Sequence, residues 1–317
     1  MSGKQHLNSY FTGQMGRHFS RILLILVISV GFWQCDSPIE LDYSDFQPKL
    51  VINAQLSSDG LFVVSVTAST TPVSMDGSEV PEGIVVTLRN ITKGEDIPMY
   101  RESDLFYASN LISPIPGNEY AFTAEAPGFD MAEAYTRIPE NLGLLKFDIK
   151  EFKIRPSSVT PNKKNVSYKL ELEFASHDDA YLHLIFKQHS KIRIGAAGTP
   201  VYENLLYPIY PQFPEESGYF PHVEDGVLIS LSEVESNPLV FSFVDYTIDA
   251  LLEELQNVQV EVRTISPEYY EYFVSLNRQL VASQDPFAEP IQVFTNINGG
   301  LGNFSSYTVT FYEIELF

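Results

Sequence analysis

The fold of this chain is decided by the stretch Val166-Ser-Tyr-Lys-Leu-Glu-Leu-Glu-Phe174, in which apolar and polar side chains alternate. Successive side chains of an extended chain point to opposite sides, so the apolar residues share one face and the polar residues share the other. This period of two predicts a β-strand with one buried face and one face in water.

Runs rich in β-branched and aromatic residues surround this stretch and predict a second β domain over residues 144–317. Its other strands are expected at 144–154, 181–194, 227–234, 239–246, 258–265, 291–295 and 307–316. One segment breaks the pattern, because Ser266 suits an N-cap, Pro267 suits the first helical position, and apolar residues follow at helical spacing. We expect an amphipathic helix over 267–283 and consider a shorter one near 248–256.

The first half of the chain contains shorter strands separated by turn-forming residues such as Pro116-Gly117 and Pro127-Gly128. These strands are expected at 49–56, 61–68, 84–91, 105–110, 119–126 and 131–138. Together they predict an N-terminal β-sandwich over 48–139, of immunoglobulin or transthyretin type. The fold class is therefore all-β, with two β-sandwich-like domains that meet near 139–143.

The amino terminus is typical of an export signal. Arg17 and Arg21 precede an uncharged apolar run from Ile22 to Trp33, and Cys35 follows. The run is shorter than the roughly 20 residues that span a bilayer as a helix. We expect residues 1–35 to be a signal peptide ending at a lipobox-like Cys35 that carries a lipid, and residues 36–47 to form an acidic tether. In the alternative, Cys35 is an ordinary apolar residue of the leader.

Composition narrows the class of protein. Aromatic residues make up 13% of the chain, with 18 Tyr and 22 Phe, which favours pleated sheets. The formal net charge of −21 repels phosphate backbones, so we expect no nucleic-acid partner. A single cysteine excludes an intramolecular disulfide and any Cys-based metal cluster.

Catalytic and cofactor motifs are missing from the sequence. It has no HExxH, GxSxG, phosphate-binding loop or calcium-loop pattern, so no catalytic residue and no cofactor is predicted. The 41 carboxylates still leave open a hydrolase of glycan or peptide that pairs two of them in space. The weak metal candidates His177, His183 and His189 would share a strand face over roughly 20 Å, too far for one ion. Solvent-facing histidines are the simpler interpretation.

Aromatic residues and prolines alternate between Pro200 and Gly226, which predicts a long ordered loop because proline resists helices and central strands. Its rings form a candidate interface, and the alternative is that they cap the second core. The residues concerned are Tyr202, Tyr207, Tyr210, Phe213, Tyr219 and Phe220.

The glycine-rich run Gly300-Leu-Gly302 resembles part of a dinucleotide fingerprint, but a strand rather than a helix is expected after it. Gly299, Gly300 and Gly302 are therefore predicted to form a structural turn with glycines at positive φ, close to the end of the helix. The alternative is a ligand-binding lip built with residues 285–290.

Six segments resemble the Bacteroidota lipoproteins of the DUF4249 family: Cys35-Asp-Ser-Pro-Ile-Glu-Leu41, Pro48-Lys-Leu-Val-Ile-Asn53, Val260-Glu-Val-Arg-Thr-Ile-Ser266, Tyr269-Tyr-Glu-Tyr-Phe273, Asp285-Pro-Phe-Ala-Glu-Pro290 and Asn296-Ile-Asn-Gly-Gly-Leu-Gly302. The resemblance implies a lipoprotein that accompanies a TonB-dependent nutrient-uptake receptor of the outer membrane, and it transfers no catalytic residue. We therefore expect a lipid-anchored binding or accessory protein of the cell envelope. A hydrolase and a structural or adhesive module are the alternatives.

Overall fold

The computed structural model describes residues 45–58, 62–71, 79–108, 114–175, 179–194, 201–212, 219–221, 224–234 and 237–316. Strands account for 58% of the structure and helices for 8%, so the prediction of an all-β protein with a single α-helix is confirmed. The predicted signal peptide, Cys35 and residues 36–44 of the predicted tether lie outside the described residues.

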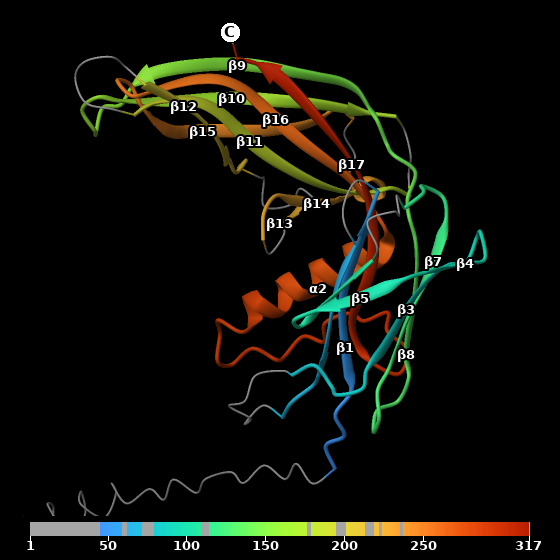
Figure 1. Ribbon diagram of the computed structural model, residues 1–317. Helices are drawn as coiled ribbons and strands as arrows, with labels where there is room; N and C mark the ends of the chain where they lie inside the picture. Colours follow the sequence, from blue (N-terminus) through green and yellow to red (C-terminus); the bar gives the residue numbers. More distant parts are fainter. Residues whose placement is uncertain are drawn as a thin grey trace, which may run out of the picture. The chain divides into compact units, whose positions relative to one another are not determined.

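A ten-stranded sheet organises the molecule, in the order β13-β14-β11-β16-β17-β1-β2-β6-β5, with β12 paired to β11 (Figure 1). Its strands are β1 (Leu50–Ser57), β2 (Val63–Ala68), β5 (Met99–Glu102), β6 (Leu105–Ala108), β11 (Tyr181–Ile194), β12 (Val201–Pro208), β13 (Tyr219–Pro221), β14 (Val227–Ser230), β16 (Glu253–Ile265) and β17 (Leu301–Glu315). A 3-10 helix (Leu231–Glu233) follows β14.

Two smaller sheets cover parts of this large sheet. A four-stranded sheet has the order β4-β3-β7-β8, and a three-stranded sheet has the order β15-β10-β9. Their strands are β3 (Val85–Asn90), β4 (Glu95–Ile97), β7 (Glu119–Glu125), β8 (Ala132–Arg137), β9 (Leu144–Pro156), β10 (Lys163–Phe174) and β15 (Leu239–Asp249). The stretch that alternated in the sequence is β10, and its apolar residues are buried while its polar residues are not.

Each smaller sheet encloses its own core against the large sheet. Phe62, Phe122 and Phe304 meet in the first core, with ring centroids 5.8 to 6.3 Å apart. In the second core, Tyr168 and Phe186 lie 5.0 and 5.4 Å from Phe243. Such offset and edge-on aromatic contacts add to the stabilisation from burial alone.

β17 belongs to both halves of the molecule. Residues 301–307 pair with β1 in parallel, and residues 307–315 pair with β16 in the antiparallel sense. Figure 1 shows this long strand, in red, running from beside β1 to the layer that contains β16. The two cores divide near the expected boundary, but the sheet is continuous across it, so the division into two domains stays a prediction, as does the immunoglobulin or transthyretin likeness.

The helix α2 (Pro267–Ala282) confirms the predicted helix. Tyr269, Tyr270, Phe273 and Val274 are buried and pack with Leu228 of β14 in a third cluster. Ser266 occupies the N-cap position, but its hydroxyl accepts a hydrogen bond from the Ser306 amide at 3.2 Å instead of capping the helix. Within the described part of the chain, no helix is long and apolar enough to cross a membrane.

Three expectations about local structure were wrong. The segment near 248–256 is a tight turn that joins β15 of the three-stranded sheet to β16 of the ten-stranded sheet, because the Asp249 carboxylate accepts the amides of Leu251 and Leu252 at 2.9 and 3.1 Å. Residues 291–295 form no strand; side chains of α2 hold them, and the Ser275 hydroxyl accepts the Phe294 amide. The predicted loop at 200–226 contains strands β12 and β13.

Candidate functional site

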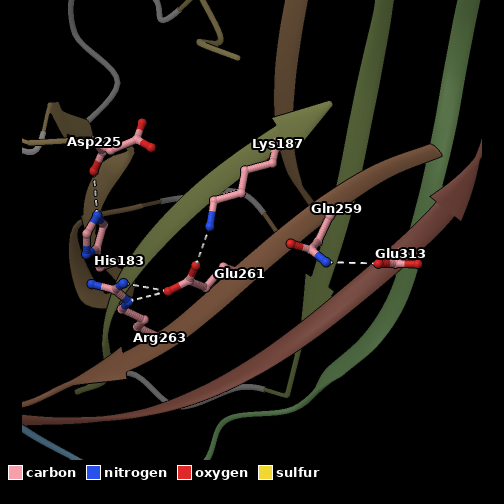
Figure 2. A network of polar contacts seen from close by, with 7 residues as sticks. All are labelled: His183, Lys187, Asp225, Gln259, Glu261, Arg263 and Glu313. Atoms are coloured by element: carbon pink, nitrogen blue, oxygen red, sulfur yellow. Dashed lines mark hydrogen bonds and ion pairs between the residues drawn. The ribbon is translucent and has the colours of Figure 1, made fainter. Parts of the chain in front are cut away.

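A charged network lies on the face of the large sheet that points away from the second core (Figure 2). The Glu261 carboxylate on β16 accepts a hydrogen bond from the Lys187 ammonium of β11 at 3.0 Å. It also accepts two from the Arg263 guanidinium, at 2.5 and 2.7 Å. Its side chain is only 7% exposed. Burial opposes ionisation, but Arg263 and Lys187 outweigh it and hold the pKa of Glu261 below its ordinary value of 4.5.

His183 lies beside this network and is fully engaged. Its Nδ1 is 3.0 Å from the Tyr269 hydroxyl, and its Nε2 is 2.6 Å from the backbone oxygen of Asp225. Gly226 permits this approach, because a Cβ there would lie 2.2 Å from the Leu184 carbonyl oxygen. Both ring nitrogens of His183 are thus occupied by protein groups, which leaves neither for a metal ion.

The other candidate ligands are not brought together with His183. His189 lies six residues further along β11 than His183, and His177 is outside the described residues. Across the described ranges, no group of three or more His, Cys, Asp or Glu side chains could hold a metal ion.

A polar groove of about 510 Å³ lies between α2 and the large sheet. Amide side chains line its floor, and rings of the helix and of β17 line its walls. The main lining residues are Asn53, Gln55, Asn303, Tyr272, Phe273 and Tyr307, with Glu224 also present. Asn303 is 3% exposed; its Nδ2 donates to the Ser305 hydroxyl at 2.8 Å, while its Oδ1 accepts no hydrogen bond within the described structure.

A second cavity, of about 400 Å³, opens at the end of the second core between β12 and β15. Tyr207, Tyr210, Phe243 and Tyr246 supply rings, and Glu253 supplies a carboxylate. The Tyr207 hydroxyl donates to Glu253 at 2.7 Å. Burial raises the pKa of both Tyr207 and Tyr246 well above the ordinary value of 10.0.

The predicted interface residues are thus divided between different places. Tyr207 and Tyr210 meet in the cavity, whereas Tyr202 is 51% exposed on β12, where the Lys191 ammonium lies 5.6 Å from its ring centroid. Phe213 lies outside the described residues, and Tyr219 and Phe220 are described only as part of strand β13. The interface role of the six aromatic residues stays a prediction.

The glycine turn has the predicted conformation at two of its three positions. Gly299 has φ +77 and Gly302 has φ +98, while Gly300 is not among the residues with positive φ. Gly300 is instead crowded, because an added Cβ would lie 2.8 Å from the Leu50 carbonyl oxygen. The turn starts the parallel pairing of β17 with β1.

Sequence reasoning missed Glu253, Tyr246, Glu261 and Asn303. Glu253 lies in the segment that was considered as a helix, and Tyr246 lies just before it. The sequence therefore did not predict that both side chains line one cavity. The sequence offered one signal for these residues: Glu261 stands among alternating apolar residues. That pattern does not show whether the carboxylate forms an ion pair or simply faces water.

Comparison with known proteins adds one finding. A family model described as a domain of unknown function (DUF4249) matches residues 36–313, which includes both cavities and the charged network. No curated protein matches the chain.

Proposed function

The chain belongs to the DUF4249 family, and we propose that it is a binding or accessory protein of the cell envelope whose groove beside α2 takes an uncharged polar ligand. The observation that supports this function most directly is Asn303, which lines the groove and whose buried Oδ1 accepts no hydrogen bond from the described residues. A buried acceptor without a partner costs about 1–3 kcal/mol. This oxygen is itself covered, so a ligand hydroxyl or amide N–H would satisfy it once the Asn303 side chain turns toward the groove.

The lining of the groove favours a neutral ligand. Amides both donate and accept hydrogen bonds, so Asn53, Gln55 and Asn303 match hydroxyl groups on a ligand better than they match a charge. No lysine or arginine is among the described lining residues, and the volume lies within the roughly 300–1,000 Å³ typical of small-molecule sites. The Tyr272 ring gives the groove a flat surface on which the apolar face of a sugar can pack. A neutral oligosaccharide is the ligand class that we propose.

Hydrolysis is the weaker alternative. Glycoside hydrolysis needs two carboxylates about 5 to 9.5 Å apart, and the described lining of the groove contains one, Glu224. Glu261 is held by two cations, which lower its pKa and disfavour a role as a general acid. No contact of the described residues favours a second catalytic group in the groove.

Calorimetric titration of the full-length chain in detergent with malto-, cello- and chito-oligosaccharides tests the groove. Asn53 is exposed and accepts from Tyr272 at 3.4 Å, so Asn53→Ala should weaken binding by about tenfold while the chain stays folded. Asn204→Ala, an exposed asparagine on β12, is the matched control. No binding by any of the three series, or equal losses in the two variants, would contradict the proposed ligand.

The envelope location rests on the leader sequence and the family resemblance. If Cys35 carries a lipid, Cys35→Ala should abolish labelling by a palmitate analogue and release the protein from membranes. Equal labelling of the two proteins would refute the anchor. Protease treatment of intact cells would then show which side of the outer membrane the protein faces.

A TonB-dependent receptor is the proposed partner, again from the resemblance. Co-purification from solubilised envelopes should enrich the receptor encoded beside this chain over unrelated outer-membrane proteins. Equal recovery of all of them would count against an accessory role and favour an independent structural or adhesive module.

A further inference from the structure

The cavity at the end of the second core combines a carboxylate with several aromatic rings. Tyr207 and Pro208 come from β12, Tyr210 from the segment that follows it, and Phe243 and Tyr246 from β15 of the three-stranded sheet. The following segment crosses between the two layers, because the Gln212 amide donates to the Ser242 carbonyl at 2.7 Å. The cavity therefore has walls from both layers of the sandwich and opens at its end.

Glu253 has no cationic partner within the part of the chain that the structure describes. Its Oε1 accepts from the Tyr207 hydroxyl at 2.7 Å, and its Oε2 accepts weakly from the Asp249 amide at 3.4 Å. The neighbouring carboxylate of Asp249 is, by contrast, paired with Lys163 at 3.1 Å. A partly buried carboxylate that lacks a cation leaves its charge available to a ligand.

The hydroxyl groups of Tyr207 and Tyr246 offer acceptors rather than donors to a ligand in the cavity. The proton of Tyr207 is used by Glu253, and the proton of Tyr246 is used by the Gln188 side-chain oxygen at 3.1 Å. Each oxygen then has only lone pairs left for a ligand. No lysine or arginine is among the described lining residues. This lining disfavours carboxylates and phosphates and favours a ligand that donates hydrogen bonds or is positively charged.

Aromatic faces point to the same ligand class. The faces of Tyr and Phe rings attract cations, and rings grouped around an ammonium form the binding sites known as aromatic cages. The formal net charge of −21 adds a long-range attraction for cations. A calcium ion would need six or more oxygen ligands, and the described residues contain no metal-binding cluster here.

We propose that this cavity binds an organic cation, a primary or quaternary ammonium whose charge lies against Glu253 and whose carbon body lies between Tyr207, Tyr210, Phe243 and Tyr246. The site is separate from the groove beside α2 and has a different ligand class. It makes the chain a binding protein with two sites on different parts of the large sheet.

Ligand-observed NMR and calorimetry on the full-length chain in detergent test the charge requirement with choline, putrescine and 3,3-dimethyl-1-butanol, an uncharged analogue of choline. Choline or putrescine should bind at least about tenfold more tightly than the uncharged analogue, the effect of one favourable charge contact. Binding of the analogue as tight as that of choline, or no binding by either cation, would overturn the proposal.

Two matched variants locate the binding site. Glu253→Gln keeps an acceptor for Tyr207 but removes the charge, and should weaken choline binding by about tenfold or more. Glu254→Gln makes the same change on the adjacent, exposed residue of β16 and should have little effect. Equal losses would mean that only the net charge matters, which contradicts the site. Asn53→Ala in the groove should leave choline binding unchanged, so each proposal can fail without the other.

Discussion

Two glutamates on the same strand, β16, have opposite surroundings. Glu261 lies on the face away from the second core, between Lys187 and Arg263, with a side chain that is 7% exposed. Glu253 lies at the end of the core in an aromatic cavity, with a tyrosine hydroxyl and a backbone amide as its partners. One carboxylate is saturated by protein groups, and the other is not.

The difference separates a structural role from a binding role. The Lys187 and Arg263 contacts of Glu261 join β11 to β16, and Arg263 also stacks on Tyr307 of β17 at 4.8 Å from the ring centroid. Such a network fixes the register of three strands but leaves no group for a ligand. Glu253, by contrast, forms no ion pair with the described residues. Buried charge alone is therefore a poor marker of a site, and the missing counter-charge is the better one.

Glu261→Gln should give the largest loss of stability. The substitution leaves Lys187 and Arg263 without their counter-charge in a poorly solvated position, which lowers the free energy of unfolding by about 3–5 kcal/mol. Urea denaturation followed by circular dichroism measures it. A loss below about 1 kcal/mol would mean that the network contributes no more than an exposed ion pair.

Gly302→Ala tests whether the two cores depend on β17, the strand that they share. At φ +98, an added Cβ would lie 2.1 Å from the Ile52 carbonyl oxygen, so the parallel pairing of β17 with β1 must shift. We expect a loss of about 3 kcal/mol from strain and lost pairing. Gly94→Ala is the control, because Gly94 also has a positive φ but open space around it, and should cost only about 1–2 kcal/mol.

The unfolding transition of Gly302→Ala also shows whether the two cores unfold together. Since β17 pairs with β1 and with β16, both cores should unfold together in a single transition. Two transitions, with choline binding retained after the first, would show that the cavity belongs to an independently folding half.

Much of this architecture follows from local sequence patterns. The alternation of β10 and the Ser266-Pro267 start of α2 predicted those elements, because each depends on residues close together in the chain. The pairing of β17 with β1 joins residues from opposite ends of the chain, and no local pattern specifies it. Likewise, the density of tyrosines and prolines identified Tyr207 and Tyr210, but Glu253 lies just after a turn between two sheets, in a segment that was considered as a helix.

Acid should destabilise the folded chain through the Glu261 network. The pKa of Glu261 is held below 4.5 in the folded chain, so the unfolded chain binds the proton more readily. The stability from this difference is present above pH 4.5 and is lost as the pH falls through the lower, folded value. Urea midpoints at pH 5, 4 and 3 should fall for the wild type and fall less for Glu261→Gln. Parallel curves for the two proteins would mean that other carboxylates dominate acid unfolding.

Glu253→Gln should have the smallest effect on stability, although it makes the same chemical change on the same strand as Glu261→Gln. A glutamine oxygen can still accept from Tyr207, and no cation loses its partner, so the free energy of unfolding should change by less than about 1 kcal/mol. Urea denaturation of Glu253→Gln beside Glu254→Gln measures this against an exposed neighbour. A loss as large as that of Glu261→Gln would show that Glu253 stabilises the fold through its contacts. The small loss that we expect, together with weaker choline binding, would instead mean that the unpaired carboxylate is retained for the ligand.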